Sequence, residues 1–462
     1  MKLLFLILTV LMPQIFSDNM VLQQNSDVAL WGTATPLSRV SIRAGWPQGS
    51  ASVIADKDGN WFARLSTPEA GGPYTLSVSD GKALKFENVM IGEVWLCSGQ
   101  SNMELPMKGY TAQPVEGSTD AIYDADPDVP IRMITVSRNP RAAAQKDVPT
   151  TGWLLNEPAA VAECSATAYF FAQRLQKTLR VPVGLVISNW GGTSIKAWCE
   201  RTTVERMEPS LSLEHLDAPG ADVCEEPLAA SLYNGMIAPL VPYTIKGWLW
   251  YQGESDRGQS ELYYHYQVAY AGMMREKWQN PDMPFYFVQI APYRYSGEDG
   301  EESGFFCEQQ ERTLDAIPHS GMVTTLDIGR RYCIHPERKR EVGSRLAYLA
   351  LYNDYGFKAI DPRAPRVKDI SFTPEGRIFI TFDKAVGPHG VFCEGFEASE
   401  DGYNFFPASG KVTNEDRCVV EVFCPCASSP KYVRYGWRNY MEGAGQLKSD
   451  AHIPAGPFRS YR

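Results

Sequence analysis

Four polar segments of this sequence contain the chemical groups that acyl transfer requires. Together they offer hydroxyl groups, glycine amides, a side-chain amide and an imidazole, and each follows a predicted strand: Ser98-Gly-Gln-Ser101-Asn-Met103, Asn189-Trp-Gly-Gly-Thr-Ser194, Tyr251-Gln-Gly-Glu-Ser-Asp256 and Ile334-His335-Pro336. A serine nucleophile needs a base to accept its proton, and the oxyanion that forms needs N–H donors. The residue types therefore predict acyl transfer through a serine.

The elements that must position these segments are the strands of a parallel sheet. Apolar runs alternate with amphipathic helical segments, which is typical of βαβ units. The predicted strands are Met90–Cys97, Ile131–Val136, Val181–Ile187, Ile245–Trp250, Pro284–Ile290 and Met322–Asp327. The predicted helices are Ala159–Leu179, Leu262–Trp278, Glu308–Ile317 and Pro336–Tyr352. A doubly wound α/β sheet of this kind gathers the polar segments at the carboxyl ends of its strands.

Both ends of the chain are rich in short strands. Apolar stretches separated by Asp-Gly and Pro turns predict a β-sandwich on each side of the α/β part. The strands expected there are Val28–Trp31, Val40–Arg43, Tyr74–Val78, Ile378–Phe382, Cys418–Phe423 and Tyr432–Tyr435. We expect three domains, an N-terminal β-sandwich that includes any signal segment, an α/β hydrolase domain and a C-terminal β-sandwich, over residues 1–90, 91–357 and 358–462.

Composition excludes some partners. The 462-residue chain has a formal net charge of −10 at pH 7, whereas nucleic acids and anionic membranes bind basic surfaces. Neither is an expected partner. Its ten cysteines lack the spacing of a zinc site, although Cys199 and Cys224 are candidates for a disulfide in an exported protein. No metal or organic cofactor is expected, and the oligomeric state is not indicated.

An apolar run from Leu3 to Met12 follows the basic residue Lys2. It is shorter than the roughly 20 residues that span a bilayer, so no transmembrane span is expected. A positive residue before a short apolar core is typical of a secretory signal, but no clear cleavage site precedes Pro13. We expect a periplasmic or secreted protein; the alternative is that part of this run forms the first strand of the fold.

Ser101 and His335 are the candidates for the catalytic pair. Ser101 stands at a predicted strand-to-helix turn, where helix N-terminal amides can hold negative charge; Ser98 and Ser194 are the competing hydroxyls. An imidazole can take the serine proton near neutral pH and return it to the leaving group. His335 alone has the expected placement at the sheet edge, in contrast to the five other histidines, His215, His265, His319, His389 and His452.

Beyond these segments, the sequence resembles the sialate O-acetylesterase family of the SGNH hydrolases. The likeness runs in order along nearly the whole chain, through Ile15–Gln23, Gly92–Met103, residues 189–194, Tyr233–Ile237, residues 248–256, His335–Pro336, Glu341–Gly343 and Pro457–Arg459. It implies an SGNH, flavodoxin-like sheet, Ser101 as the nucleophile and an O-acetylated sugar as the substrate.

The expected oxyanion hole combines two backbone amides with one side chain. We expect the N–H groups of Ser101 and Gly192 and the side-chain amide of Gln252, which takes the role that asparagine has in many SGNH enzymes. Gly191 is the alternative to Gly192. Asn102 is a further candidate for a supporting role. The competing interpretation is that Gln252, together with Glu254 and Asp256, only fixes its loop.

The sequence departs from the family pattern beside the histidine. Relatives usually carry an aspartate two or three residues before it, but this chain has Cys333 and Tyr332 there. Three alternatives follow. A more distant carboxylate reaches His335, from Asp327, Glu254 or Asp256; a backbone carbonyl orients the ring in a Ser–His dyad; or the protein is a weakened or inactive relative.

The sugar is the least determined part of the prediction. The resemblance favours 9-O-acetylated sialic acid, while acetylxylan and other glycans stay open. Substrate selection is expected in two longer connections, residues 104–130 with Lys108 and Tyr110, and residues 200–230 with Arg201 and Arg206. The alternative of another class is a non-catalytic carbohydrate-binding protein with a degenerate hydrolase domain.

Overall fold

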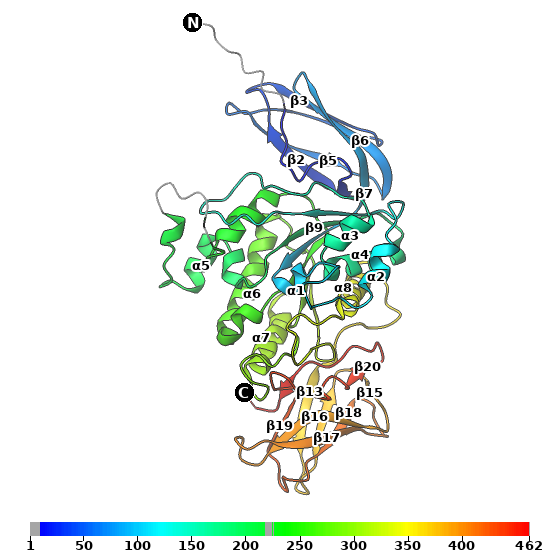
Figure 1. The fold of residues 1–462 in the computed structure, drawn as a ribbon, viewed down its shortest axis with the longest axis vertical. Helices are drawn as coiled ribbons and strands as arrows, with labels where there is room; N and C mark the ends of the chain where they lie inside the picture. The colour runs from blue at the N-terminus through cyan, green and yellow to red at the C-terminus, as the bar shows by residue number, and fades with distance from the viewer. Residues whose placement is uncertain (1–9, 218–223, 225, 462) are drawn as a thin grey trace.

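A parallel sheet forms the middle of the molecule, between two β-rich parts (Figure 1). The structure is a computed structural model that describes residues 10–217, 224 and 226–461. The parallel strands follow the order β8, β9, β7, β10, β11, β12. Their bounds are Ile131–Thr135, Val183–Asn189, Ala83–Gly99, Gly247–Tyr251, Phe285–Val288 and Ser320–Val323, respectively. The predicted doubly wound α/β fold with β-rich flanks is confirmed.

Strand β7 connects the first β-rich part directly to the parallel sheet. Its first half pairs antiparallel with β6, and from Glu93 onward it pairs parallel with β9. The expected boundary at residue 90 therefore lies inside one continuous strand. In this part, β6, β3 and β4 continue the sheet of β7, β1 pairs parallel with β7, and β2 and β5 form a separate two-stranded sheet. The bounds of these strands are β1 (Val21–Gln23), β2 (Asp27–Thr33), β3 (Arg39–Ala44), β4 (Ser50–Ile54), β5 (Asn60–Ser66) and β6 (Gly71–Ser79).

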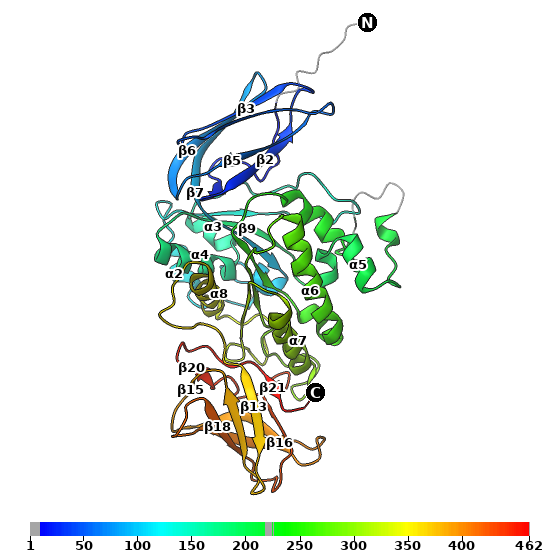
Figure 2. The same ribbon diagram turned by 180° about the vertical axis from the view of Figure 1, so that it is seen from behind.

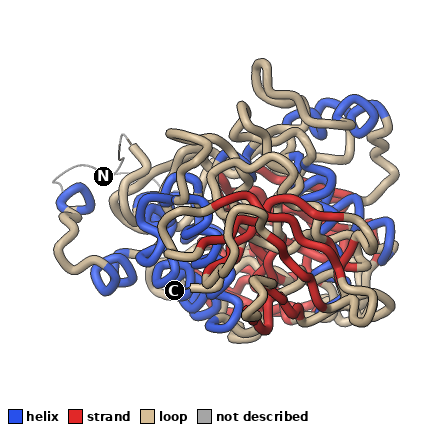
Figure 3. The backbone as a smooth tube through the Cα atoms, turned by 90° about the horizontal axis from the view of Figure 1, so that it is seen from below, coloured by secondary structure: helices blue, strands red, loops and turns tan. Residues whose placement is uncertain are grey.

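Helices cover both faces of the parallel sheet, as the tube view shows (Figure 3). Successive side chains of a strand point to opposite faces, and β7 follows this rule. Trp95 and Cys97 belong to the hydrophobic core that includes α4 and α8, whereas Val94 and Leu96 belong to the core that includes α6. The longer helices are α4 (Ala166–Leu179), α6 (Ser260–Lys277), α7 (Glu302–Ala316) and α8 (Lys339–Asp354). The shorter ones are α1 (Ser101–Glu104), α2 (Ser118–Tyr123), α3 (Pro158–Glu163) and α5 (Arg201–Met207).

One predicted helix is divided in two. The sequence predicts a continuous helix over Ala159–Leu179, but the chain leaves helical geometry at Cys164 and Ser165. The Ser165 hydroxyl accepts a hydrogen bond from the N–H of Ala168 and caps α4. Serine favours such caps because its side chain replaces the missing backbone acceptor. The expectation of a single helix was wrong.

The C-terminal part lies beyond the carboxyl edge of the parallel sheet (Figures 1 and 2). Ion pairs connect it to the α7 region of the α/β part. Arg434 binds Glu301 at 2.5 Å, and Arg459 binds Glu308 at 2.8 Å. Seven strands form its antiparallel sheet: β13 (Val367–Phe372), β14 (Ile378–Phe382), β18 (Val419–Phe423), β17 (Phe406–Val412), β16 (Phe392–Ser399), β19 (Tyr432–Tyr435) and β21 (Phe458–Arg459). A smaller sheet pairs β15 (Val386–Gly387) with β20 (Lys448–Ser449).

Three expectations concern export: the apolar N-terminal run, the disulfide and the lack of a membrane span. Most of the apolar run Leu3–Met12 lies outside the described residues, while Leu11 pairs with Thr33 in an isolated bridge. All ten cysteines have free thiols, so the Cys199–Cys224 disulfide is not formed. Within the described ranges, no helix has the length and apolarity needed to cross a membrane.

Candidate active site

Strand register brings three of the four polar segments to one point. Gly99 at the end of β7 lies opposite Asn189 of β9 and Tyr251 of β10. The residues that follow these three positions therefore emerge together at the carboxyl edge of the sheet, in the middle of its strand order. Ser101 begins α1 two residues after Gly99. The edge predicted from the sequence is the place where the polar segments meet.

Ser101 and His335 contact each other across 234 residues of sequence. The Oγ atom of Ser101 lies 2.8 Å from Nε2 of His335, which is within the distance needed for proton transfer. The competing serines are placed differently: Ser98 is fully buried, and the Ser194 hydroxyl donates to Asp256. Among these three serines, the imidazole faces Ser101.

The two glycines after β9 have different surroundings. Gly191 packs directly on Ser101, since a Cβ atom there would lie 3.0 Å from Cβ of Ser101. Its N–H donates to Oε2 of Glu104 at 2.8 Å. Gly192 has a φ of 75° and open space around it, and its N–H meets no acceptor within the described chain. Of the two alternatives, Gly192 has the amide that is free to receive a ligand oxygen.

Glu104 holds this glycine loop, a role that no sequence pattern indicates. Besides the Gly191 amide, its carboxylate accepts the guanidinium of Arg138 at 2.6 Å and the hydroxyl of Tyr110 at 3.3 Å. Glu104 lies in the same turn of α1 as Ser101. The turn that carries Ser101 and the glycine loop are therefore connected through one side chain.

The contacts of Gln252 contradict its expected role. Its side chain is fully buried, and its Nε2 donates to the Thr193 carbonyl at 3.0 Å and to Asp256 Oδ2 at 2.5 Å. Because both N–H groups are used within the protein, none is free for an oxyanion. Gln252 instead ties its own turn to the glycine loop. The competing interpretation, that Gln252 and Asp256 fix the loop, agrees with these hydrogen bonds.

None of the three suggested carboxylates reaches the histidine. Asp327 pairs with Arg345 at 2.7 Å and Lys448 at 2.7 Å, Asp256 binds Gln252 and Ser194, and Glu254 binds Asn102. The expectation that one of them supports His335 was wrong. Nδ1 of His335 lies instead 2.5 Å from Oε1 of Gln113. No sequence pattern connects a glutamine 222 residues away to this ring, although Gln113 lies in the connection expected to select substrate.

A buried polar network lies next to Ser101, around the side chain of Asn102. Asn102 donates to Glu254 at 2.6 Å and accepts from Lys339 Nζ at 2.5 Å. All three side chains are buried. Burial lowers the pKa of Lys339 to about 7 and raises the pKa of Glu254. Asn102 thus connects the turn that carries Ser101 to Glu254 and to Lys339 of α8.

His335 has an unusually low pKa. Burial in the first place, and then the positive charge of Lys339, lower its pKa to about 4. Desolvation disfavours the charged form of an imidazole. The ring is therefore neutral at pH 7, which is the state in which it can accept a proton from Ser101.

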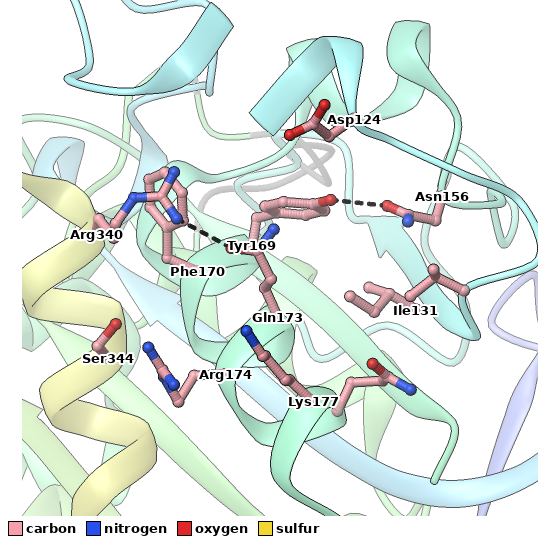
Figure 4. A pocket seen from close by; sticks show the side chains of 12 residues that line it. Asp124, Ile131, Asn156, Tyr169, Phe170, Gln173, Arg174, Lys177, Arg340 and Ser344 are labelled. Carbon is pink, nitrogen blue, oxygen red and sulfur yellow. Dashed lines mark hydrogen bonds between the residues drawn. The ribbon is translucent and has the colours of Figure 1, made fainter. Parts of the chain in front are cut away.

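A pocket lies on the outer face of α4 and α8, away from Ser101 and His335. It has a volume of about 390 Å³ and is lined by Asp124, Val129, Ile131, Asn156, Tyr169, Phe170, Gln173, Arg174, Gln176, Lys177, Arg340 and Ser344 (Figure 4). We call it the cationic pocket, because Arg174, Lys177 and Arg340 have no carboxylate partner among the described residues. Arg340 donates to Gln173 at 3.2 Å and lies over the Phe170 ring.

Comparison with known proteins gives concordant findings. Residues 91–351 match the family described as carbohydrate esterase, sialic acid-specific acetylesterase. Sialate O-acetylesterase of Mus musculus is 25% identical, over 96% of this chain and 93% of that protein. The Homo sapiens protein of the same name is 24% identical, over 96% and 91%.

A solved structure shares the whole architecture. A carbohydrate acetylesterase from Xanthomonas citri superposes with a TM-score of 0.86 and is 31% identical, with 98% of this chain and 99% of that chain covered. The similarity therefore includes both β-rich flanks as well as the parallel sheet.

Proposed function

The chain belongs to the sialic acid-specific acetylesterase family of carbohydrate esterases and is a carboxylic ester hydrolase, and from this premise we propose that Ser101 removes O-acetyl groups from a sugar through an acetyl-serine intermediate. The observation that carries the proposal is the 2.8 Å contact between Ser101 and His335 at the carboxyl edge of the sheet.

In the first half of the reaction, His335 acts as a general base. Nε2 accepts the Ser101 proton while Oγ bonds to the acetyl carbonyl carbon, and a tetrahedral oxyanion forms. The N–H groups of Ser101 and Gly192 receive that oxyanion; one such donor typically contributes about 3 kcal/mol to the transition state. The C–O bond to the sugar then breaks, and the imidazolium returns its proton to the leaving sugar oxygen.

In the second half, water replaces the sugar. His335 takes a proton from the water as its oxygen attacks the acetyl-serine carbonyl, and collapse of the second tetrahedral intermediate releases acetate. The proton returns to Oγ of Ser101, which restores the resting enzyme. Each proton is carried by His335, so no residue other than this pair changes its covalent state.

For the substrate we propose 9-O-acetylated sialic acid, whose carboxylate needs a cation near the site. Arg257 lies in the turn that follows Gln252 and contacts the carbonyl of Glu254 at 3.4 Å. Its guanidinium stacks on Tyr295, 3.6 Å from the ring centroid, and no carboxylate pairs with it in the described chain. Arg201, which the sequence suggested for this task, is already bound to Asp217 and Glu205.

Two measurements test the proposal. With p-nitrophenyl acetate, whose leaving group departs readily, mass spectrometry of acid-quenched enzyme is expected to find one acetyl group on the peptide that contains Ser101. An enzyme that turns over without this adduct contradicts the covalent step.

Arg257→Met is expected to lower kcat/KM on a 9-O-acetylated sialoside about tenfold or more, the loss of a hydrogen bond to a charged group. Its rates on p-nitrophenyl acetate and on acetylxylan, which lack that carboxylate, should stay at the wild-type values. Faster turnover of acetylxylan than of the sialoside by the wild-type enzyme contradicts the proposed sugar.

We also propose export to the periplasm or beyond, supported by the apolar run Leu3–Met12 after Lys2. Fractionation of expressing cells, followed by N-terminal sequencing of the protein, tests it. Full-length protein found only in the cytoplasm contradicts export.

A further inference from the structure

We propose that Gln113 is the positioning residue of this active site, and that its neutral amide takes the place of the carboxylate that Tyr332 and Cys333 do not provide. The inference rests on the proposed function of Ser101 and His335. Oε1 of Gln113 accepts the Nδ1–H of His335 at 2.5 Å. The ring is thereby held in the tautomer whose free lone pair, on Nε2, faces Ser101.

The direction of this hydrogen bond matters. If the amide N–H group faced the ring instead, Nδ1 would have to be the acceptor and Nε2 would carry the proton. Nε2 could then not accept the serine proton. Loss of the correct tautomer lowers kcat about 10⁴-fold in a serine protease triad. A base at Nε2 therefore requires an acceptor at Nδ1, and Gln113 is the residue that supplies one.

The backbone around Gln113 is fixed by its own hydrogen bonds. The N–H of Gln113 donates to the Tyr110 carbonyl at 2.9 Å, and the N–H of Tyr110 donates back to the Gln113 carbonyl at 3.1 Å. Gly109 begins this turn with a φ of 77°, and a Cβ atom there would lie 2.5 Å from the Gln113 carbonyl oxygen. Glycine permits both the left-handed backbone and the close approach. The amide is therefore presented from a closed turn.

The same turn also contacts the other side of the site. The Tyr110 ring packs edge-on against the His335 ring, with centroids 5.5 Å apart, and its hydroxyl donates to Glu104. Gln113 and Glu104 thus belong to one connected set of contacts. Through it, the turn that holds the imidazole is linked to the side chain that holds the glycine loop.

A neutral partner orients the imidazole but adds no negative charge beside it. The charged and titratable groups that face His335 are the ammonium of Lys339, the phenol of Tyr110 and the thiol of Cys333, with Glu254 beyond Lys339. Among the residues that the structure describes, no carboxylate contacts the ring. A glutamate in place of Gln113 would add one, and an opposite charge at this range raises the pKa of a histidine by about one unit or more.

Three variants test the role: Gln113→Met, Gln113→Glu and, as a matched control, Gln173→Met in the cationic pocket, where the glutamine Oε1 also accepts one hydrogen bond. Gln113→Met should lower kcat on p-nitrophenyl acetate about 10- to 100-fold, part of the general-base contribution, with KM unchanged. Gln113→Glu should retain kcat and move the acidic limb of the pH profile upward by about one pH unit. Gln173→Met should match the wild type.

A spectroscopic readout separates positioning from folding. In ¹H–¹⁵N spectra, the resonances of the neutral His335 ring are expected to report Nδ1–H in the wild type, and a mixture of tautomers in Gln113→Met. Wild-type kcat in Gln113→Met, or an unmoved acidic limb in Gln113→Glu, overturns the inference.

These outcomes are distinct from failure of the proposed function. If the wild-type enzyme is active and Ser101→Ala is inactive while Gln113→Met is unaffected, only the role of Gln113 is wrong. If Ser101→Ala keeps its activity, the nucleophile itself is wrong. A Gln113→Met protein that does not fold leaves Gln113→Glu, which preserves the side-chain length, to decide the matter.

Discussion

Two consecutive residues of α8 belong to two very different regions of the molecule. Lys339 is buried and donates to Asn102 beneath Ser101, at the catalytic edge of the sheet. Arg340 is exposed and contributes to the cationic pocket on the outer face of the same helix. Both regions contain cations and hydrogen-bonding side chains, but of these two regions it is the sheet edge that brings a serine hydroxyl, the proposed nucleophile, into contact with an imidazole.

The difference lies in how fixed each polar group is. At the catalytic edge, Ser101, His335 and Gln113 form a chain of hydrogen bonds with a defined order, and Glu104 ties the glycine loop to the nucleophile. In the cationic pocket, Arg174 lies over the Tyr348 ring and Lys177 is exposed, and neither has a carboxylate partner in the described chain. Catalysis depends on reacting groups that are held in position, so pocket volume and charge are the weaker signals.

The largest expected effect comes from removing the reacting groups. Ser101→Ala and His335→Ala should each lower kcat on an acetyl ester about 10⁴- to 10⁶-fold, as in other serine hydrolases. Ser344→Ala makes the same change in the cationic pocket and should leave kcat unchanged. Initial rates with matched circular dichroism spectra check the result. Comparable losses in Ser344→Ala would remove the distinction between the two regions.

A smaller effect is expected from loosening the glycine loop. Glu104→Leu removes the acceptor of the Gly191 amide and the partner of Arg138. Misplacement of a positioned group by about 1 Å can lower the rate about 100-fold, and we expect a decrease of that order in kcat. KM for p-nitrophenyl acetate should change little. Lys108 pairs with Glu163 on the surface, so Glu163→Leu serves as a control that breaks an ion pair without touching the loop.

The pH dependence of kcat/KM is a further test of the environment of His335. His335 works as a base only when neutral, and its pKa is lowered to about 4. Between pH 7 and pH 5, kcat/KM should therefore fall by only about a tenth, whereas an imidazole with the usual pKa of 6.5 would lose about 25-fold. Lys339, whose pKa is lowered to about 7, changes from about half protonated at pH 7 to almost fully protonated at pH 5. A profile whose acidic limb lies near pH 6.5 contradicts a desolvated base.

The same shift has a consequence for stability. In the unfolded chain the imidazole binds a proton below about pH 6.5, but in the folded protein it does so only near pH 4. The unfolded state therefore binds more protons in this interval, and the free energy of unfolding decreases as the pH falls from 6.5 to 4. His335→Gln should show a smaller decrease over the same range. Denaturant titrations at both ends of the interval measure it.

The sequence predicted the positions along the strands better than the partners of each side chain. Ser101 and His335 could be placed because strand ends of a parallel sheet converge, a rule that depends only on the order of elements. Gln252, Asp327 and Gln113 could not be assigned in this way. Their contacts depend on rotamers and on how separate loops meet, across 222 residues for Gln113 and His335 and 59 residues for Gln252 and Thr193. Neither leaves a periodic pattern in the sequence.

The smallest expected effect is at the cationic pocket. Arg174→Met with Arg340→Met removes two positive charges there, at side chains that contact Tyr348, Phe170 and Gln173 but no catalytic group. At physiological salt, charges beyond about 8 Å are largely screened, so kcat, KM and the acidic limb should stay within about twofold of the wild type. Arg340 is exposed and Arg174 half-buried, and substitutions at the surface usually change stability by less than about 0.5 kcal/mol. A tenfold loss of kcat would mean that Arg340 is energetically coupled to His335 through Lys339. The two faces of α8 would then form one site.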